Sequence, residues 1–180
     1  MKHISIILTL FLAFSYQATA QETEFNVNCK EKIQKDLEYP NEQGERKKVC
    51  KFKNYLFKSI GFPDYKGRYS YYEYELLQIE KTDTLKIKNF DFFNEKAQEL
   101  EKLINEKLKT EYESNLKIPE IKECMELIDF RYYNLNEFGI SFDYKKQMEF
   151  HIDLGTISAC LNVGGSIITL NYSEIEKYLK

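Results

Sequence analysis

The chain lacks the short motifs that mark many enzymes and nucleic-acid-binding proteins. It has no C-x-x-C pair, no glycine-rich phosphate loop carrying a lysine, and no G-x-S-x-G around a serine. It also lacks an excess of basic side chains, with 26 lysines and arginines against 29 acidic residues and a net charge of −3. A mildly acidic chain with interspersed charges is not typical of nucleic-acid binding. The sequence therefore predicts neither a nucleic-acid partner nor a cofactor.

After residue 14 there is also no apolar run of membrane-spanning length, which is about 20 residues. The main apolar run is residues 4–14, and it follows a basic start that contains Lys2. Ala18-Thr19-Ala20 then places small residues at the two positions that a signal peptidase reads. This order predicts a cleaved signal peptide over residues 1–20 and a periplasmic or secreted mature chain over residues 21–180. Cleavage would remove one basic and no acidic side chain, which leaves 25 against 29 and a charge of −4.

Four cysteines lie in the predicted mature chain: Cys29, Cys50, Cys124 and Cys160. An even number of cysteines in an exported protein favours disulfide bonds, and four cysteines allow three pairings. We favour Cys29–Cys50 with Cys124–Cys160, because this pairing keeps each bridge within one half of the chain. The alternative is a zinc site that combines cysteines with His151. The cysteine spacing does not fit such a site, so no metal is predicted.

Alternating and strand-forming residues predict an antiparallel sheet. Residues 68–79 and 85–88 are expected to form a β-hairpin, with Tyr72, Tyr74 and Leu76 on one face of its first strand. In contrast, Ile33 and Leu37 have the i,i+4 spacing of a helix, which predicts a helix over residues 29–39. Further strands are predicted at residues 49–53, 130–135, 138–144, 150–154 and 166–172.

The clearest helix is predicted between Asp91, as its N-cap, and Pro119, which blocks its continuation. Its apolar residues recur every three or four positions, at Phe93, Ala97, Leu100, Ile104, Leu108 and Tyr112. A short helix is expected over residues 121–128, and a capping box of Ser173 and Glu176 predicts another at the C-terminus. The expected fold class is α+β, an antiparallel sheet with one long helix packed across it and a short C-terminal helix. We expect one domain over residues 21–180, with an N-terminal segment (21–67) and a helix-on-sheet core (68–180).

Candidate functional residues are few. His151 is the only histidine of the predicted mature chain, and no nucleophile elbow accompanies it. The other candidates share one face of the predicted strand at residues 68–79: Tyr69, Tyr71, Glu73 and Glu75. Tyrosines supply flat amphipathic contact area, so this face favours binding over catalysis. A pair of carboxylates acting as in a glycosidase is the alternative. No catalytic residue is assigned.

The last third of the chain resembles the RsiV-like ectodomain family. The residues that carry this resemblance are Tyr133-Asn134-Leu135-Asn136, Gly139-Ile140-Ser141-Phe142 and Leu170-Asn171-Tyr172-Ser173-Glu174-Ile175. Domains of that family occur in lysozyme-sensing anti-sigma factors and beside peptidoglycan deacetylases. Over residues 85–180 the resemblance implies a helix packed on an antiparallel sheet, in an extracytoplasmic module that binds cell-envelope partners. The chain departs from the family at residues 145–151, where a proline- and tyrosine-rich segment is replaced, and no binding residue is carried over.

Three functions are consistent with these observations. The first is a monomeric, non-catalytic binding module for a protein or cell-envelope partner. The second is a small secreted hydrolase acting on a cell-wall or glycan substrate. The third is a structural or inhibitory protein stabilised by its disulfides.

Overall fold

The computed structural model describes residues 25–34, 44–63, 69–155, 160 and 165–180. The predicted signal peptide, residues 1–20, lies outside the described residues. Within them, no helix has both the length and the apolar character that a membrane span requires.

The larger of two antiparallel sheets is formed by the first half of the chain. Its strands are β1 (Asn28–Gln34), β2 (Glu45–Phe52), β3 (Tyr55–Pro63), β4 (Tyr69–Glu80) and β5 (Asp83–Lys86), in the order β1-β2-β3-β4-β5. The hairpin predicted from the sequence is confirmed as β4 and β5. Because β5 is short, it pairs only with Leu77–Glu80 at the end of β4.

The smaller sheet is formed by the last third of the chain. Its strands are β6 (Gly139–Phe142), β7 (Met148–Asp153) and β8 (Gly165–Leu170), in the order β6-β7-β8. Alternation along β7 and β8 divides the residues between two faces. Met148, Phe150 and Ile152 lie on the buried face of β7, and Glu149 and His151 lie on the opposite face.

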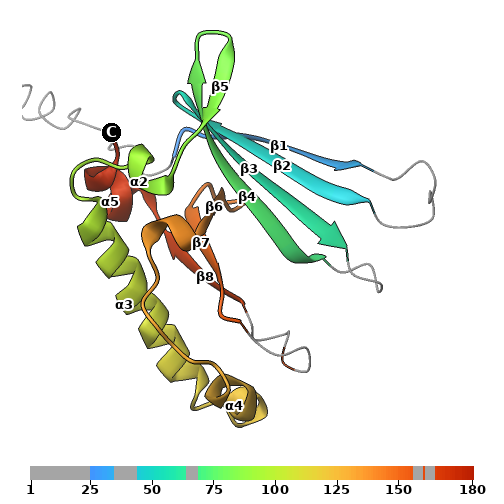
Figure 1. The fold of residues 1–180 in the computed structure, drawn as a ribbon, viewed down its shortest axis with the longest axis vertical. Coiled ribbons are helices and arrows are strands. Elements are labelled where there is room, and N and C mark those ends of the chain that lie inside the picture. Colours follow the sequence, from blue (N-terminus) through green and yellow to red (C-terminus); the bar gives the residue numbers. More distant parts are fainter. Residues whose placement is uncertain (1–24, 35–43, 64–68, 156–159, 161–164) are drawn as a thin grey trace, which may run out of the picture.

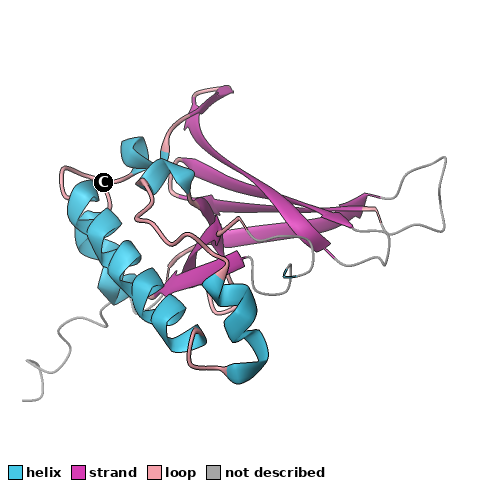
Figure 2. Cartoon of the chain, turned by 60° about the horizontal axis from the view of Figure 1, so that its bottom comes forward, coloured by secondary structure: helices cyan, strands magenta, loops and turns pink. Residues whose placement is uncertain are grey.

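Helices cover the smaller sheet on one side, and the long strands of the larger sheet extend away on the other (Figures 1 and 2). The helical elements are α2 (Asn89–Phe92), α3 (Ala97–Asn115), α4 (Pro119–Glu126), η2 (Leu135–Glu137), α5 (Tyr172–Ile175) and η4 (Glu176–Tyr178). The apolar stripe of α3 buries Leu100, Ile104 and Leu108, and this helix packs against β8. The α+β class, the long helix and the short C-terminal helix are therefore confirmed, with two antiparallel sheets in place of one.

A cluster of phenylalanine rings joins the two sheets. Phe142 of β6 makes edge-to-face contacts with Phe57 of β3 and with Phe25, each at 5.1 Å between ring centroids. Phe92 of α2 contacts Phe57 in the same way at 5.2 Å. Such aromatic pairs contribute about 0.5–1.5 kcal/mol beyond the burial of their area. The hydrophobic core is thus continuous between the sheets and fixes how they face each other.

Both favoured disulfide bonds are present. Cys29–Cys50 joins residues directly opposite each other on β1 and β2, and Cys124–Cys160 ties α4 to residue 160 beside the core. All four cysteines are used in these bonds, so the alternative zinc site with His151 is wrong.

The helix predicted over residues 29–39 is wrong where the structure describes it, because residues 28–34 form strand β1. The i,i+4 spacing of Ile33 and Leu37 was the only helical signal, and Ile33 is exposed rather than packed on a core. Pairing with β2 and the cross-strand disulfide hold this segment extended.

The strand predicted at residues 130–135 is also wrong. The backbone of this segment forms hydrogen bonds with α3 instead of with a strand. The buried Asn105 side chain accepts from the N–H of Tyr133 and donates to its carbonyl, each at 2.8 Å. The chain then enters η2, where Asn134 accepts from the N–H of Asn136 and Glu137 accepts from the N–H of Asn134. These local bonds replace a β-ladder.

Two helix starts differ from the prediction. Asp91 accepts from the N–H of Lys88 and so caps the short helix α2, while α3 begins only at Ala97. At the C-terminus the capping box is Asn171 with Glu174, two residues before the predicted pair. Since β8 runs to Leu170, Asn171 is the first residue free to turn the chain.

Candidate functional site

The candidate site lies where the polar face of the smaller sheet meets β4 of the larger one. In the register of β6 and β7, Ser141 stands opposite Glu149, and Gly139 stands opposite His151. All four residues are on the face that points away from α3. Residues of β6 also pack directly against β3 and β4.

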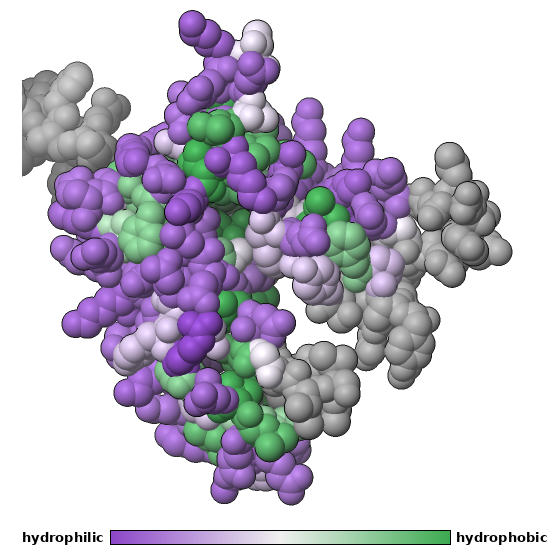
Figure 3. All heavy atoms as spheres, in the orientation of Figure 1, coloured by the Kyte–Doolittle hydropathy of each residue, from purple (hydrophilic) through white to green (hydrophobic). Residues whose placement is uncertain are grey.

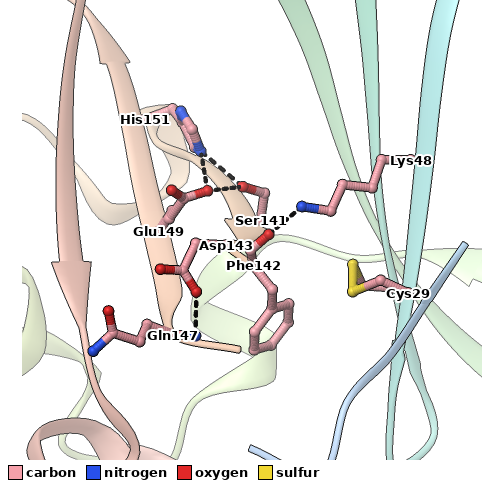
Figure 4. The surroundings of a disulfide bond; sticks show 9 residues. Cys29, Lys48, Ser141, Phe142, Asp143, Gln147, Glu149 and His151 are labelled. Atoms are coloured by element: carbon pink, nitrogen blue, oxygen red, sulfur yellow. Dashed lines mark hydrogen bonds and ion pairs between the residues drawn. A yellow bond between two sulfur atoms is a disulfide. The ribbon is translucent and has the colours of Figure 1, made fainter. Parts of the chain in front are cut away.

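Three polar side chains on this face form a compact cluster (Figure 4). The Ser141 hydroxyl lies 2.8 Å from a Glu149 carboxylate oxygen and 2.7 Å from Nε2 of His151. The same Glu149 oxygen is 3.4 Å from that nitrogen. The Glu149 and His151 side chains are only 20% and 18% exposed, and Ser141 is buried, so the cluster is largely shielded from water.

Lys48 of the larger sheet reaches across to this cluster. Its ammonium donates to the main-chain carbonyl of Phe142 at the end of β6 (Figure 4). Burial by itself would raise the pKa of Glu149, but hydrogen bonds from His151 and Ser141 and the nearby Lys48 charge hold that pKa below its ordinary value. Glu149 is therefore a stable carboxylate that links the two sheets electrostatically.

Aromatic rings continue from this cluster onto β4. The Tyr74 ring stacks on the His151 ring with centroids 4.8 Å apart and planes 24° from parallel. Tyr72 lies beyond Tyr74 at 6.2 Å and 26°. We call Tyr72, Tyr74 and His151 the aromatic ladder. Burial raises the pKa of the Tyr74 phenol, so Tyr74 stays neutral at physiological pH.

A glycine makes room for the ladder. A Cβ on Gly139 would lie 2.1 Å from the nearest carbon of the Tyr74 ring, which is far inside van der Waals contact. Gly139 does not have a positive φ, so its conformation alone does not require glycine. Its missing side chain is what lets β4 lie close against β6.

The cluster does not have the geometry of a catalytic triad. In a triad the carboxylate orients the imidazole through Nδ1 while the serine approaches Nε2. Here the Ser141 hydroxyl and the Glu149 carboxylate both lie close to Nε2 of His151, and the hydroxyl also donates a hydrogen bond to the carboxylate. Because Ser141 is only 7% exposed, its hydroxyl is poorly placed to attack a substrate. The arrangement can dock the sheets and present polar atoms, but it lacks an activated nucleophile.

The other predicted site residues lie on the opposite face of β4. Tyr71 is 57% exposed and lies beside Phe62 of β3 at 5.7 Å, and Glu73 is exposed as well. Glu75 pairs with Lys86 at 3.1 Å and with Lys58 at 3.8 Å. The backbone of Tyr69 belongs to β4, but its side chain is outside the described part of the structure. His151 therefore does not join the residues with which the sequence grouped it.

Five residues of the candidate site were not predicted from the sequence: Tyr72, Tyr74, Ser141, Glu149 and Lys48. The i,i+2 spacing of Glu149 and His151 and that of Tyr72 and Tyr74 do place each pair on one strand face. No local pattern indicates that these two faces meet. Among the described residues, no group of histidine, cysteine and carboxylate side chains is arranged to hold a metal ion.

Comparison with known proteins gives no relative: no protein-family model, curated protein or solved structure matches the chain. The resemblance of residues 85–180 to the RsiV-like family therefore stays a prediction.

Proposed function

We propose that this chain is an exported, non-catalytic binding module for a protein or cell-envelope partner. The observation that carries the proposal is the aromatic ladder of Tyr72, Tyr74 and His151, which runs across the junction of the two sheets. All three rings are partly accessible and are held in nearly parallel planes by the strands beneath them.

Tyrosine is well suited to such a role. Its ring offers a large apolar area at little cost in conformational entropy, and its hydroxyl adds a hydrogen bond. The ladder also has charged neighbours of both signs. Arg46 pairs with Glu31 and interacts with Tyr72. Glu149 lies near Tyr74, and the Lys48 charge acts on Glu149 in turn. Tyr71 and Phe62 form a separate aromatic contact on the opposite face of β4.

The hydrolase alternative has less support. The observation that favours it most is the short contact between the Ser141 hydroxyl and Nε2 of His151. However, the Glu149 carboxylate also lies beside that same nitrogen. Turnover of peptidoglycan fragments by the purified protein, lost on replacing His151, Glu73 or Glu75, would favour this alternative.

Export is supported by the N-terminal pattern over residues 1–20 and by the two disulfide bonds, which persist mainly in oxidising compartments. The resemblance to an extracytoplasmic family agrees with the same location. The partners that this location offers are envelope proteins and the cell wall.

The proposal is tested with residues 21–180, folded with both disulfides intact. Three probes are used: lysozyme, which the family resemblance suggests, purified peptidoglycan, and an envelope extract. We expect retention of a partner that Tyr72→Ser weakens at least about tenfold, as for an aromatic residue central to an interface. Tyr144→Ser is the matched control, because Tyr144 is 87% exposed and lies in the turn between β6 and β7. Failure of all three probes, or equal weakening by both substitutions, would contradict the proposal.

A further inference from the structure

The outer face of the larger sheet points away from the smaller sheet. Side chains alternate between the two faces of a strand, and directly opposite residues of an antiparallel pair lie on the same face. On β2, Phe52 is buried in the core and Lys48 reaches β6, so the even-numbered residues of β2 face the smaller sheet. Lys47, Val49 and Lys51 therefore lie on the outer face.

Five lysines surround Val49 on this outer face. Two of them stand directly opposite Val49 on β1 and β3, two lie two positions away along β2, and the fifth is a diagonal neighbour on β1. Such neighbours have Cβ atoms about 4.5–8 Å apart, so the five ammonium groups can converge on one ligand. We call them the lysine ring: Lys30, Lys32, Lys47, Lys51 and Lys58.

Three of the five lysines have no compensating carboxylate. Lys47 pairs with Glu45 at 2.9 Å, and Lys58 pairs with Glu75 at 3.8 Å. The others are exposed and form no ion pair within the described part of the chain: Lys30, Lys32 and Lys51. Glu45 is the only acidic side chain on the outer face of β1, β2 and β3, all of whose residues the structure describes. The sheet itself therefore does not neutralise the positive charge of the ring.

This concentration of charge is unfavourable for an isolated sheet. Lys32 stands directly opposite Lys47, and like charges in that position destabilise strand pairing. The chain as a whole has the opposite sign, with a net charge of −3. In the view of Figure 3, hydrophilic side chains gather over β1 and β2, and a small apolar area lies beside them. A ring of lysines on an acidic protein indicates a site for an anionic partner.

The apolar centre of the ring favours a protein as that partner. Val49 is half-buried, as are Leu56 and Ile60 beside it on β3. A centre of apolar side chains within a charged rim is the usual organisation of a protein interface. Val49 has a shorter side chain than the lysines around it, so it does not protrude as the apolar residues of membrane-binding surfaces do. A polyanionic polysaccharide offers no comparable apolar side chain to place over it.

We propose that the lysine ring binds an acidic segment of a partner protein, in which carboxylates surround an apolar side chain. The carboxylates pair with the lysines, and the apolar side chain packs on Val49. Charge complementarity of this kind speeds association and selects the partner more than it raises affinity. The inference goes beyond the proposed function, because this surface lies on the opposite face of the larger sheet from the aromatic ladder and does not require it.

The test uses residues 21–180 with both disulfides intact and an acetylated, amidated peptide, Glu-Asp-Glu-Leu-Glu-Asp-Glu. We expect binding at low ionic strength that weakens as salt is added, although protein and peptide both carry a net negative charge. Reversing two charges of the ring together, by Lys30→Glu with Lys51→Glu, is expected to weaken binding at least about tenfold. The matched control is Lys96→Glu with Lys102→Glu, which makes the same change in net charge at exposed positions on and next to α3.

The apolar centre is tested separately. Val49→Thr keeps a β-branched strand former but replaces one methyl group with a hydroxyl. It is expected to weaken binding of the leucine peptide about fourfold, the effect of one buried methyl group, and to leave unchanged the binding of a peptide with serine in place of leucine. Heparin and vesicles of phosphatidylglycerol are the comparison probes, because they present negative charge without an apolar side chain at their surface.

The proposal is overturned if the leucine peptide does not bind up to about 1 mM, which is already a weak affinity. Equal weakening by the ring variant and the control variant would overturn it as well, since net charge rather than the ring would then determine binding. Heparin or vesicles bound through the ring as tightly as the leucine peptide, with no effect of Val49→Thr, would assign the ring to a polyanion or a lipid surface instead. Retention of a partner through Tyr72 does not depend on these outcomes, so the proposed function is tested independently.

Discussion

The ring of Tyr74 on β4 stacks on the imidazole of His151 on β7, and this contact joins the two sheets at their polar margin. The phenylalanine cluster joins them at the apolar end. Gly139 lies against the Tyr74 ring, and the Ser141 hydroxyl and the Glu149 carboxylate both lie at Nε2 of the imidazole. The candidate site is therefore also part of the interface between the sheets, which has consequences for stability.

Replacing Gly139 with alanine is expected to displace the Tyr74 ring. The new Cβ would overlap three ring atoms at 2.1–2.6 Å, so either the ring or β6 must move. Overpacking of this kind costs about 1–3 kcal/mol. A fall in melting temperature of roughly 2–4 °C per kcal/mol should follow, measured by circular dichroism. Gly165→Ala is the control, because its Cβ would meet nothing closer than 3.8 Å. Equal melting temperatures for the two variants would show that the ring contact is not tight.

Replacing Glu149 with glutamine is expected to flatten the dependence of stability on acid pH. The folded protein holds the pKa of Glu149 below its ordinary value of 4.5, so the unfolded chain binds the proton more readily. The stability that this group contributes is complete above pH 4.5 and is lost as the pH falls through the lower, folded pKa. Urea unfolding at several pH values from neutral to about 3 measures this difference.

Glu149→Gln should keep some acid sensitivity, since Glu137 and Glu174 also have lowered pKa values. Glu99→Gln on the exposed face of α3 is the control for the chemical change itself. A Glu149→Gln profile as steep as that of the wild type would show that this carboxylate does not stabilise the fold.

Removing either disulfide is expected to cost about 3–4 kcal/mol of stability by the chain-entropy relation, with the larger loss at Cys124–Cys160. The reason is loop length, since the sequence separations are 21 residues for Cys29–Cys50 and 36 residues for Cys124–Cys160. Paired cysteine-to-alanine variants, compared by guanidinium unfolding, measure each bond separately. If both pairs unfold at the wild-type midpoint, the bonds do not constrain the unfolded chain.

Replacing Asn105 with alanine is expected to destabilise the protein by roughly 2–6 kcal/mol. Its amide bonds the N–H and the carbonyl of Tyr133, and both would be left buried without a partner at about 1–3 kcal/mol each. Thermal unfolding measures the effect. Gln98→Ala on the same helix is the control, because Gln98 is exposed and alanine is a strong helix former. A loss no larger than that of the control would show that residues 130–135 hold their path by other means.

Several features could be predicted from the sequence because they depend on local periodicity. The three- and four-residue spacing from Ala97 to Leu108 indicates a helix with one apolar face, whatever lies opposite it. Alternation predicts the hairpin of β4 and β5 for the same reason. The disulfide pairing was favoured among three possible pairings because it keeps each bridge within one half of the chain, and the structure contains that pairing. Where local signals were weak or in competition, as at Ile33 and at residues 130–135, tertiary pairing and side-chain hydrogen bonds determined the outcome.

The candidate site has a different origin. Spacing along each strand predicts that Tyr74 shares a strand face with Tyr72, and His151 with Glu149. It does not predict that these two faces are in contact. Their contact depends on the packing of Phe142 against Phe57 and on the absence of a side chain at Gly139, both of which are relations between distant parts of the chain. Periodicity specifies which face of a strand is polar, whereas the partner of that face is chosen by the free energy of packing the whole core.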